Sequence, residues 1–96
     1  MPNRPWIIQI KIKVSMPGRE SLGPMLAEGT VYTLAQGNRE LYTTHDLTNQ
    51  EILAWESKPE AKRALDYLRP TNRLLYDNEC RVVHRFHRGQ NTLVFI

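Results

Sequence analysis

Apolar and polar residues alternate along residues 6–15, WIIQIKIKVS. A period of two that is carried by β-branched residues is typical of a strand with one face on a core and one face in water. The alternation therefore predicts a half-buried strand near the start of the chain. Its apolar side consists of Ile8, Ile10, Ile12 and Val14, and its polar side consists of Gln9, Lys11 and Lys13.

Residues 28–44 predict a β-hairpin, which follows a loop over residues 16–24 that is rich in Pro and Gly. Gly37-Asn38 is placed at the tip, because glycine at the first central position favours a type II′ turn. The resulting predicted pairs are Leu34 with Leu41, Thr33 with Tyr42, and Val31 with Thr44.

Residues 48–70 carry the helical signals of the chain. Thr48 precedes Glu51 by three residues, and Ser57 precedes Glu60 by the same spacing. This spacing is that of a capping box, in which the two side chains satisfy free amide groups of the first helical turn. The segment therefore predicts two helix starts, one after each cap residue.

Two prolines set the expected limits of these helices. Pro59 suits a first helical turn, where its missing N–H is not needed, and Pro70 disfavours helix in the residue before it. We expect helices over about 49–56 and 58–69, with a break between them. The second helix presents one apolar stripe, formed by Ala61, Ala64, Leu65 and Leu68.

Residues 80–96, CRVVHRFHRGQNTLVFI, predict a second hairpin around Gly89-Gln90, in which Phe86 pairs with Leu93 and His84 with Phe95. The order of elements is then strand, hairpin, helix pair and hairpin. This order predicts an α+β fold over residues 1–96 as one domain, with an antiparallel sheet of about five strands and a helical hairpin on one face.

Composition limits the class of protein. With 96 residues and 41% hydrophobic content the chain can bury one core. Its single cysteine, Cys80, excludes an internal disulfide and indicates a reducing compartment. No run approaches the roughly 20 apolar residues of a membrane span, and the apolar start is interrupted by Gln9, Lys11 and Lys13, unlike a signal peptide. We expect a cytoplasmic protein without a membrane partner.

Catalytic and metal-binding motifs are not evident. His84 and His87 point to opposite faces of a strand, and Cys80 lies about 13 Å from His84 at roughly 3.3 Å per residue. The glycines lack the Lys and Ser/Thr of a phosphate-binding loop, and the helical carboxylates form no close pair. We therefore expect no enzyme activity, no metal and no cofactor.

Positive charge is concentrated in the strand-rich ends of the chain. Residues 1–35 hold four basic and two acidic residues, residues 36–70 hold five and six, and residues 71–96 hold four and two. If the first and last strand regions are neighbours, their outer face forms a cationic surface, interrupted by Val83 and Val94. The alternative is a solvated face whose charges prevent aggregation. The candidate binding residues are Lys11, Lys13, Arg81, Arg85, His87 and Arg88.

These observations favour a non-enzymatic protein that acts by docking on a protein or nucleoprotein partner. Phage or mobile-element inhibitors of host defence complexes, of the anti-CRISPR kind, offer an analogy of size and style. The alternative is direct nucleic-acid binding through the basic strand face. The protein partner is preferred, because a net charge of +3 is small for a duplex binder and the aromatic residues alternate away from the arginines.

Overall fold

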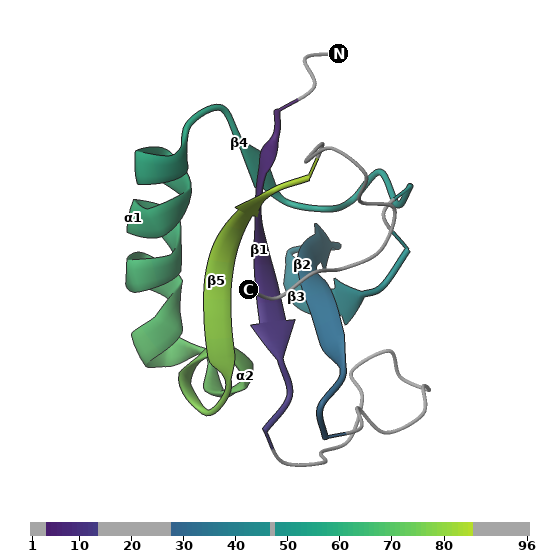
Figure 1. The fold of residues 1–96 in the computed structure, drawn as a ribbon, viewed down its shortest axis with the longest axis vertical. Helices are drawn as coiled ribbons and strands as arrows, with labels where there is room; N and C mark the ends of the chain where they lie inside the picture. The colour runs from purple at the N-terminus through teal and green to yellow at the C-terminus, as the bar shows by residue number, and fades with distance from the viewer. Residues whose placement is uncertain (1–3, 14–27, 47, 86–96) are drawn as a thin grey trace.

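The computed structural model describes residues 4–13, 28–46 and 48–85, which form an antiparallel sheet with helices packed against it (Figure 1). The strands are β1 (Trp6–Lys11), β2 (Val31–Gly37), β3 (Glu40–Thr44), β4 (Ala54–Trp55) and β5 (Glu79–His84). The helical elements are α1 (Lys58–Leu68), the 3₁₀ helix η1 (Arg69–Thr71) and α2 (Arg73–Tyr76). The predicted α+β class, with a five-stranded antiparallel sheet, is confirmed.

Strand β1 lies at the centre of the sheet and pairs antiparallel with three other strands. β5 follows one edge of β1 along its whole length. The other edge is shared, because β2 pairs with Gln9, Ile10 and Lys11 while β4 pairs with Trp6 and Ile7. β3 extends the sheet beyond β2. The side chains of β1 are therefore placed in the middle of both sheet faces.

The face of β1 toward α1 carries the main core. The isoleucines that the alternation placed together are at most 1% exposed. Burying such a side chain contributes roughly 1.5–3 kcal/mol, so this stripe is a large part of what holds α1 and α2 on the sheet. The buried members of the cluster are Ile8, Ile10, Ile12, Leu34, Leu65 and Leu75.

The opposite face of β1 is more buried than the alternation predicts. Lys11 and Lys13 are exposed, as expected, but Gln9 is only 2% exposed. A second apolar cluster lies on this face, formed by Ile7, Ala35 and Ile52. The prediction of a solvated face is therefore wrong for Gln9. A period of two shows which side chains share a face, but other segments decide whether that face is covered.

The β2–β3 hairpin is present, but its tip lies one residue later than predicted. The turn residues are Asn38 and Arg39, with φ of 53° and 66°. Two positive φ angles belong to a type I′ turn, whose twist matches that of the strands, so the predicted type II′ turn at Gly37-Asn38 is wrong. The observed pairs are Thr33–Thr44, Leu34–Thr43, Ala35–Tyr42, Gln36–Leu41 and Gly37–Glu40, which replace the predicted Leu34–Leu41, Thr33–Tyr42 and Val31–Thr44.

The first predicted helix, over residues 49–56, is not formed. Thr48 does not act as its N-cap, because its hydroxyl and its N–H both donate to Asp46 Oδ1, at 2.6 and 2.9 Å. Asn49 Oδ1 accepts the N–H of Glu51 at 2.7 Å. Side chains of Asp and Asn that bind nearby amide groups favour turns over helix, and the segment starts as a pair of such turns.

The residues that follow pair with the sheet. Gln36 donates its N–H to Glu51 O at 3.0 Å, and Leu53 donates its N–H to Leu34 O at 3.1 Å. Ile52 lies between them as the partner of an alanine of β2, and the chain then enters β4 beside β1. Long-range strand pairing therefore overrides the local helical signal in this segment.

Helix α1 follows the second start signal. Ser57 is its N-cap, the Ser57 Oγ accepts the Glu60 N–H at 3.3 Å, and Pro59 stands in the first turn. The helix ends at Leu68, shortly before Pro70, as predicted. The apolar stripe faces the sheet, as the predicted packing of this helix on one sheet face requires. Within the stripe Ala61 and Leu65 are buried, whereas Ala64 and Leu68 are half-buried.

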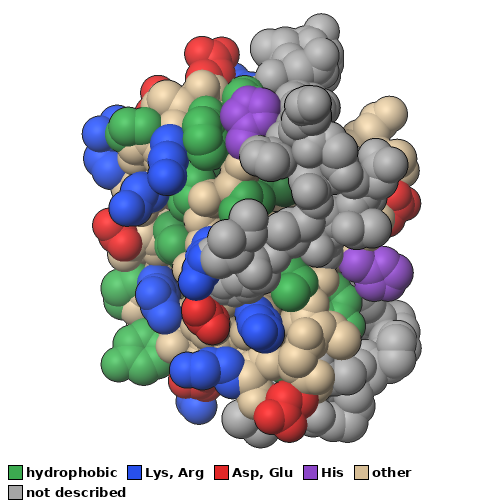
Figure 2. Space-filling model, in the orientation of Figure 1, with side chains coloured by type: hydrophobic (Ala, Val, Ile, Leu, Met, Phe, Trp, Pro, Cys, Tyr) green, Lys and Arg blue, Asp and Glu red, His purple; other side chains and the backbone are tan. Residues whose placement is uncertain are grey.

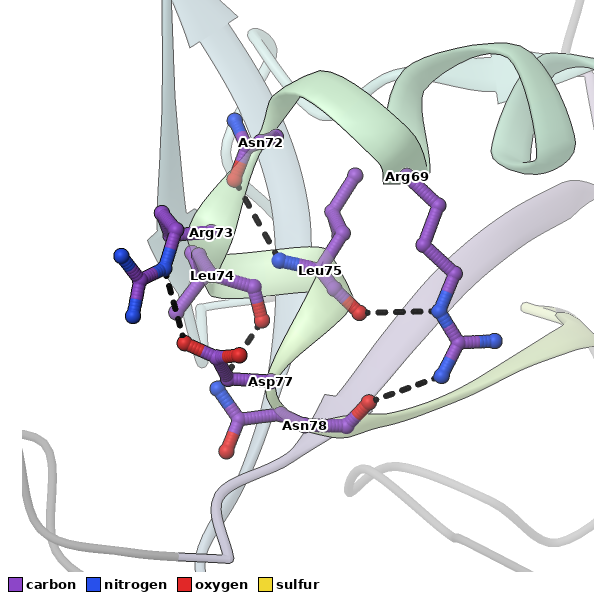
Figure 3. A network of polar contacts seen from close by, with 7 residues as sticks. All are labelled: Arg69, Asn72, Arg73, Leu74, Leu75, Asp77 and Asn78. Carbon is purple, nitrogen blue, oxygen red and sulfur yellow. Dashed lines mark hydrogen bonds and ion pairs between the residues drawn. The ribbon is translucent and has the colours of Figure 1, made fainter.

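A polar network connects the end of α1 to β5 (Figure 3). The Arg69 guanidinium donates to Leu75 O at 3.1 Å and to Asn78 O at 3.2 Å. Asn78, which is 3% exposed, donates to Leu74 O at 2.9 Å and accepts the Lys13 N–H at 2.8 Å. The side chain of Asn78 therefore ties α2 to the end of β1, and Arg69 fixes the point at which β5 begins.

The first strand of the predicted C-terminal hairpin corresponds to β5. The predicted turn and return strand, within residues 86–96, lie outside the described residues. In the part of the chain that the structure describes, no helix has the length and apolar character needed to cross a membrane.

Candidate functional site

The predicted cationic surface required the first and last strand regions to be neighbours, and β1 and β5 are. Gln9 is the register partner of Arg81, and Lys11 is that of Glu79. Lys11 and Arg81 therefore share a face, as expected. However, Glu79 lies directly across from Lys11 and forms an ion pair with Arg81, with Nη2 and Oε2 3.6 Å apart. A carboxylate thus stands among these cations and lowers the local positive potential.

The remaining predicted cations are spread out. Lys13 follows β1 and is exposed, whereas Arg85 follows β5, is half-buried, and donates its N–H to Pro5 O at 2.7 Å. The two lie at opposite ends of the β1–β5 ladder, roughly 25 Å apart at about 3.3 Å per residue. His87 and Arg88 lie outside the described residues. The described cations form a line along the strands rather than a compact patch.

A groove of about 510 Å³ lies between α1 and β5, where α1 runs alongside the strand (Figure 1). Successive residues of β5 point to alternate faces of the sheet, yet all of residues 80–84 border this groove. The groove therefore opens along the edge of the strand. The other lining residues are Trp6 of β1 and Lys58, Lys62, Leu65 and Asp66 of α1.

The groove has an apolar floor and a mainly cationic rim. Leu65 is buried at its base, and Lys58 and Lys62 are exposed one helical turn apart on α1. Arg81 adds a third cation from the strand, where it is paired with Glu79, and Asp66 supplies a further carboxylate. Figure 2 shows Lys and Arg side chains over α1 and β5 on this face, with hydrophobic side chains and individual Asp and Glu side chains among them. This arrangement suits a ligand that is apolar in part and negatively charged.

Aromatic rings meet at the start of β1. The rings of Trp6 and His84 lie edge to face, with centroids 5.0 Å apart and planes at 83°. Lys58 Nζ lies 5.9 Å from the centre of the Trp6 ring, within the range of a cation–π contact. His84 is thus packed against an aromatic side chain, and the contact with Trp6 orients Lys58 while its charge stays exposed.

The outer edge of β5 presents main-chain groups to the groove. In an antiparallel ladder, every second residue directs its N–H and C=O to the same neighbour. Arg85 donates its N–H to Pro5 O on the β1 side, so every second residue of β5 counted from Arg85 faces β1. The intervening residues, including Cys80 and Val82, direct their N–H and C=O groups away from β1. No backbone hydrogen bond joins these outward groups of Cys80 or Val82 to another of the described segments.

Cys80 does not have the environment of a nucleophile. Burial raises the pKa of its thiol to about 11, and Arg69 opposes this only in part. The Sγ donates to Leu75 O at 3.4 Å. A thiol with this pKa carries almost no thiolate at neutral pH, and the thiolate is the reactive form. The described contacts of Cys80 are those of a packing residue.

A metal centre does not form among the described residues. Within residues 4–13, 28–46 and 48–85, no three His, Cys, Asp or Glu side chains come close enough together to hold an ion. The expectation that the protein needs no metal stays a prediction, as does the absence of enzyme activity.

Sequence reasoning missed the groove. Lys58 and Lys62 have the i,i+4 spacing that places two cations on one helix face, and this was the available signal. Their connection with Arg81 depends on α1 lying beside β5, which no local pattern reveals. Comparison with family models, with curated proteins and with solved structures finds no match to the chain.

Proposed function

We propose that the protein is a non-enzymatic binding protein that docks on a protein or nucleoprotein partner. The observation that supports this is the groove between α1 and β5, which combines an apolar floor, a mainly cationic rim and main-chain groups of β5 that have no backbone partner among the described segments. Apolar area supplies affinity in such sites, while charged groups at the rim select the partner and speed its association. A finer proposal, an inhibitor of a host defence complex from a phage or mobile element, has the support of analogy in size alone.

Direct nucleic-acid binding is the alternative, and the described β1–β5 face gives it less support. Its cations form a line that includes Glu79, which is ion-paired with Arg81. Each phosphate contact requires a cation, and duplex binding through about five such contacts would weaken by about three decades between 50 and 200 mM salt. A steep salt dependence is therefore the signature of this alternative.

The test begins with capture of the partner from cells of the native host, with and without nuclease, followed by its identification and purification. The dissociation constant of the purified pair is then measured for wild type and for two charge-matched variants. Lys58→Glu/Lys62→Glu changes the groove, and Lys11→Glu/Lys13→Glu changes the strand face by the same charge. We expect the first variant to weaken binding by at least about tenfold and the second by much less.

Several results would contradict the proposal. Loss of the partner on nuclease treatment, together with tight binding of random oligonucleotides at physiological salt that Lys11→Glu/Lys13→Glu abolishes, would favour the nucleic-acid function. Equal affinities for both variants would show that the partner does not use the groove, which contradicts the role of the groove and leaves docking itself intact.

A further inference from the structure

We infer that the partner contributes an extended acidic peptide segment, which adds to the sheet as a strand along the outer edge of β5. The inference rests on the proposed function and specifies its binding mode. The segment would lie between β5 and α1, with its backbone paired to the strand and its side chains against the helix.

The backbone of β5 is arranged for strand addition. Cys80 and Val82 direct N–H and C=O groups away from β1, and these groups have no backbone partner among the described segments. Neighbouring strands lie about 4.8 Å apart, and the edge from Cys80 to Val82 is roughly 7 Å long, which matches an incoming segment of about three residues.

The outward groups alternate between donors and acceptors. A peptide backbone offers both in the same repeat, so that it can pair with each N–H and each C=O in turn. A phosphate backbone offers acceptors only, and would leave the carbonyls of Cys80 and Val82 without a donor. The pattern therefore favours a peptide over a nucleic acid at this edge.

Helix α1 forms the second wall of the site. Leu65 and Val82 line the groove from opposite sides, and both pack in the main core, where Leu65 is buried and Val82 half-buried. Side chains of an added strand would alternate between the two sheet faces, so every second residue would lie against this apolar surface. Binding would extend the sheet and cover the groove in one step.

Charge selects among possible occupants. The rim carries Lys58, Lys62 and Arg81 against two carboxylates, those of Asp66 and of Glu79, which is ion-paired with Arg81. The remaining positive charge favours an acidic segment. A second copy of the chain is disfavoured, because pairing β5 with β5 would bring the cationic rims together, and like charges across paired strands are destabilising. Charge complementarity therefore points to a partner strand with Asp or Glu.

The test uses a library of blocked nine-residue peptides with Asp or Glu at every second position and varied apolar residues between them. A matched library carries Lys or Arg at the same positions. We expect selection on the immobilised protein to enrich acidic peptides, which shift the amide resonances of Cys80 and Val82 and slow their hydrogen exchange. Lys58→Glu/Lys62→Glu should weaken an enriched peptide by at least about tenfold, and Lys11→Glu/Lys13→Glu should not.

Backbone methylation distinguishes strand addition from binding by side chains alone. N-methylation of the enriched peptide at alternate residues removes the donors that face β5, and methylation of the other alternate set leaves them. We expect the first set to weaken binding by at least about tenfold, because several hydrogen bonds are lost, and the second set to have little effect. Equal effects of the two sets would overturn strand addition.

Two protein variants test the same backbone hydrogen bonds by removing N–H groups of β5. Val82→Pro removes an N–H that points outward, a position at which edge strands tolerate proline, so we expect it to fold and to lose peptide binding. Val83→Pro removes an N–H that points toward β1 and should lower stability. If Val82→Pro does not fold, the methylated peptides decide the question.

Other occupants appear as distinct outcomes. Shifts of the Cys80 and Val82 amides that depend on protein concentration alone would identify a second copy, and shifts caused by oligonucleotides would identify nucleic acid. Shifts on removal of residues 90–96 would identify the predicted return strand of the C-terminal hairpin. Any of these results, or a library in which no acidic peptide moves these amides, overturns the inference. The two proposals can fail separately. A purified protein partner that binds without using the groove would contradict this binding mode and leave docking as the proposed function.

Discussion

Segments 48–56 and 57–68 are adjacent in the chain and begin with the same spacing of a hydroxyl residue three positions before a glutamate. The first makes two tight turns and then pairs with β2 and β1. The second forms α1 and packs on the opposite side of the sheet from the cluster that contains Ile52. The same local signal thus leads to different structures, and its surroundings decide between them.

The direction of one hydroxyl hydrogen bond separates the two cases. Ser57 Oγ accepts the N–H of Glu60, which is the bond of an N-cap, whereas the Thr48 hydroxyl donates to Asp46. Asp46 and Asn49 compete for the amide groups that a helix would leave to its cap. After the turns, the edge of β2 supplies backbone partners that a helix over 49–56 would have to give up. A capping pattern therefore predicts a helix only where neighbouring side chains and strand edges do not compete for the same groups.

The largest effect is expected from Leu65→Ala in α1. Leu65 is 8% exposed and belongs to the main core, and truncation of a buried leucine costs about 2–5 kcal/mol from lost transfer energy and the remaining cavity. Urea denaturation followed by circular dichroism measures the loss. A midpoint equal to that of wild type would show that the helix is not held by its apolar stripe, and would remove the packing contrast between the two segments.

Replacing each cap residue compares the segments directly. Ser57→Ala removes the acceptor of the Glu60 N–H and should cost about 1 kcal/mol. Thr48→Ala removes only an exposed hydroxyl bond to Asp46 and should stay within about 0.5 kcal/mol, as is usual for surface substitutions. Both values come from denaturant titration of matched samples. Equal losses at the two positions would mean that Thr48 acts as a cap after all.

A coupling of about 0.5–1 kcal/mol, the lower part of the range for residues in contact, is expected between Gly37 and Glu51. A Cβ on Gly37 would lie 2.6 Å from Glu51 Oε1, so Gly37→Ala should displace this carboxylate from its hydrogen bond with the Tyr42 hydroxyl. In a Glu51→Ala background the same change should be neutral or stabilising, because the conflict is gone and alanine restricts the unfolded chain.

A double-mutant cycle gives this coupling. If no coupling is found, the Glu51 side chain lies away from the β2–β3 hairpin. A helix over 49–56 could have placed it in such a position. Glu60, the counterpart of Glu51 in α1, provides the control, since Glu60→Ala should not alter the effect of Gly37→Ala.

The sequence predicts those elements whose signals are local and agree with one another. For β1 the alternation and the β-branched residues agree, and for α1 the Ser57 cap, Pro59 and the apolar stripe agree. The prediction failed where a distant segment decides, as for Gln9, which is buried with Ile7 although Lys11 and Lys13 on the same side of the strand are exposed. The predicted hairpin tip lies one residue too early. The predicted and observed registers keep every side chain on the same face of the sheet, so only turn geometry distinguishes them.

The candidate site divides in the same way. The position of Lys11 and Arg81 on one face could be predicted, because it requires only the strand period and the pairing of β1 with β5. The groove could not, because Lys58 and Lys62 meet Arg81 only through the packing of α1 beside the strand. That packing depends in part on Arg69 and its contacts beyond the end of the helix, a set of interactions with no sequence period.

The smallest effect concerns the carboxyl group of Asp46. Its pKa is lowered, first by the hydrogen bond from the Thr48 hydroxyl and then by that from the Thr48 N–H, while desolvation opposes both. Because the folded-state pKa lies below the unfolded value, the stabilisation is present above the unfolded pKa and is lost as pH falls through the folded pKa. Thr48→Val should raise the pKa of Asp46 toward its ordinary value, and Thr48→Ser should keep it low. Carboxyl ¹³C titration measures the change directly. An unchanged pKa in Thr48→Val would mean that the hydroxyl does not bind Asp46 and would restore Thr48 as a candidate cap.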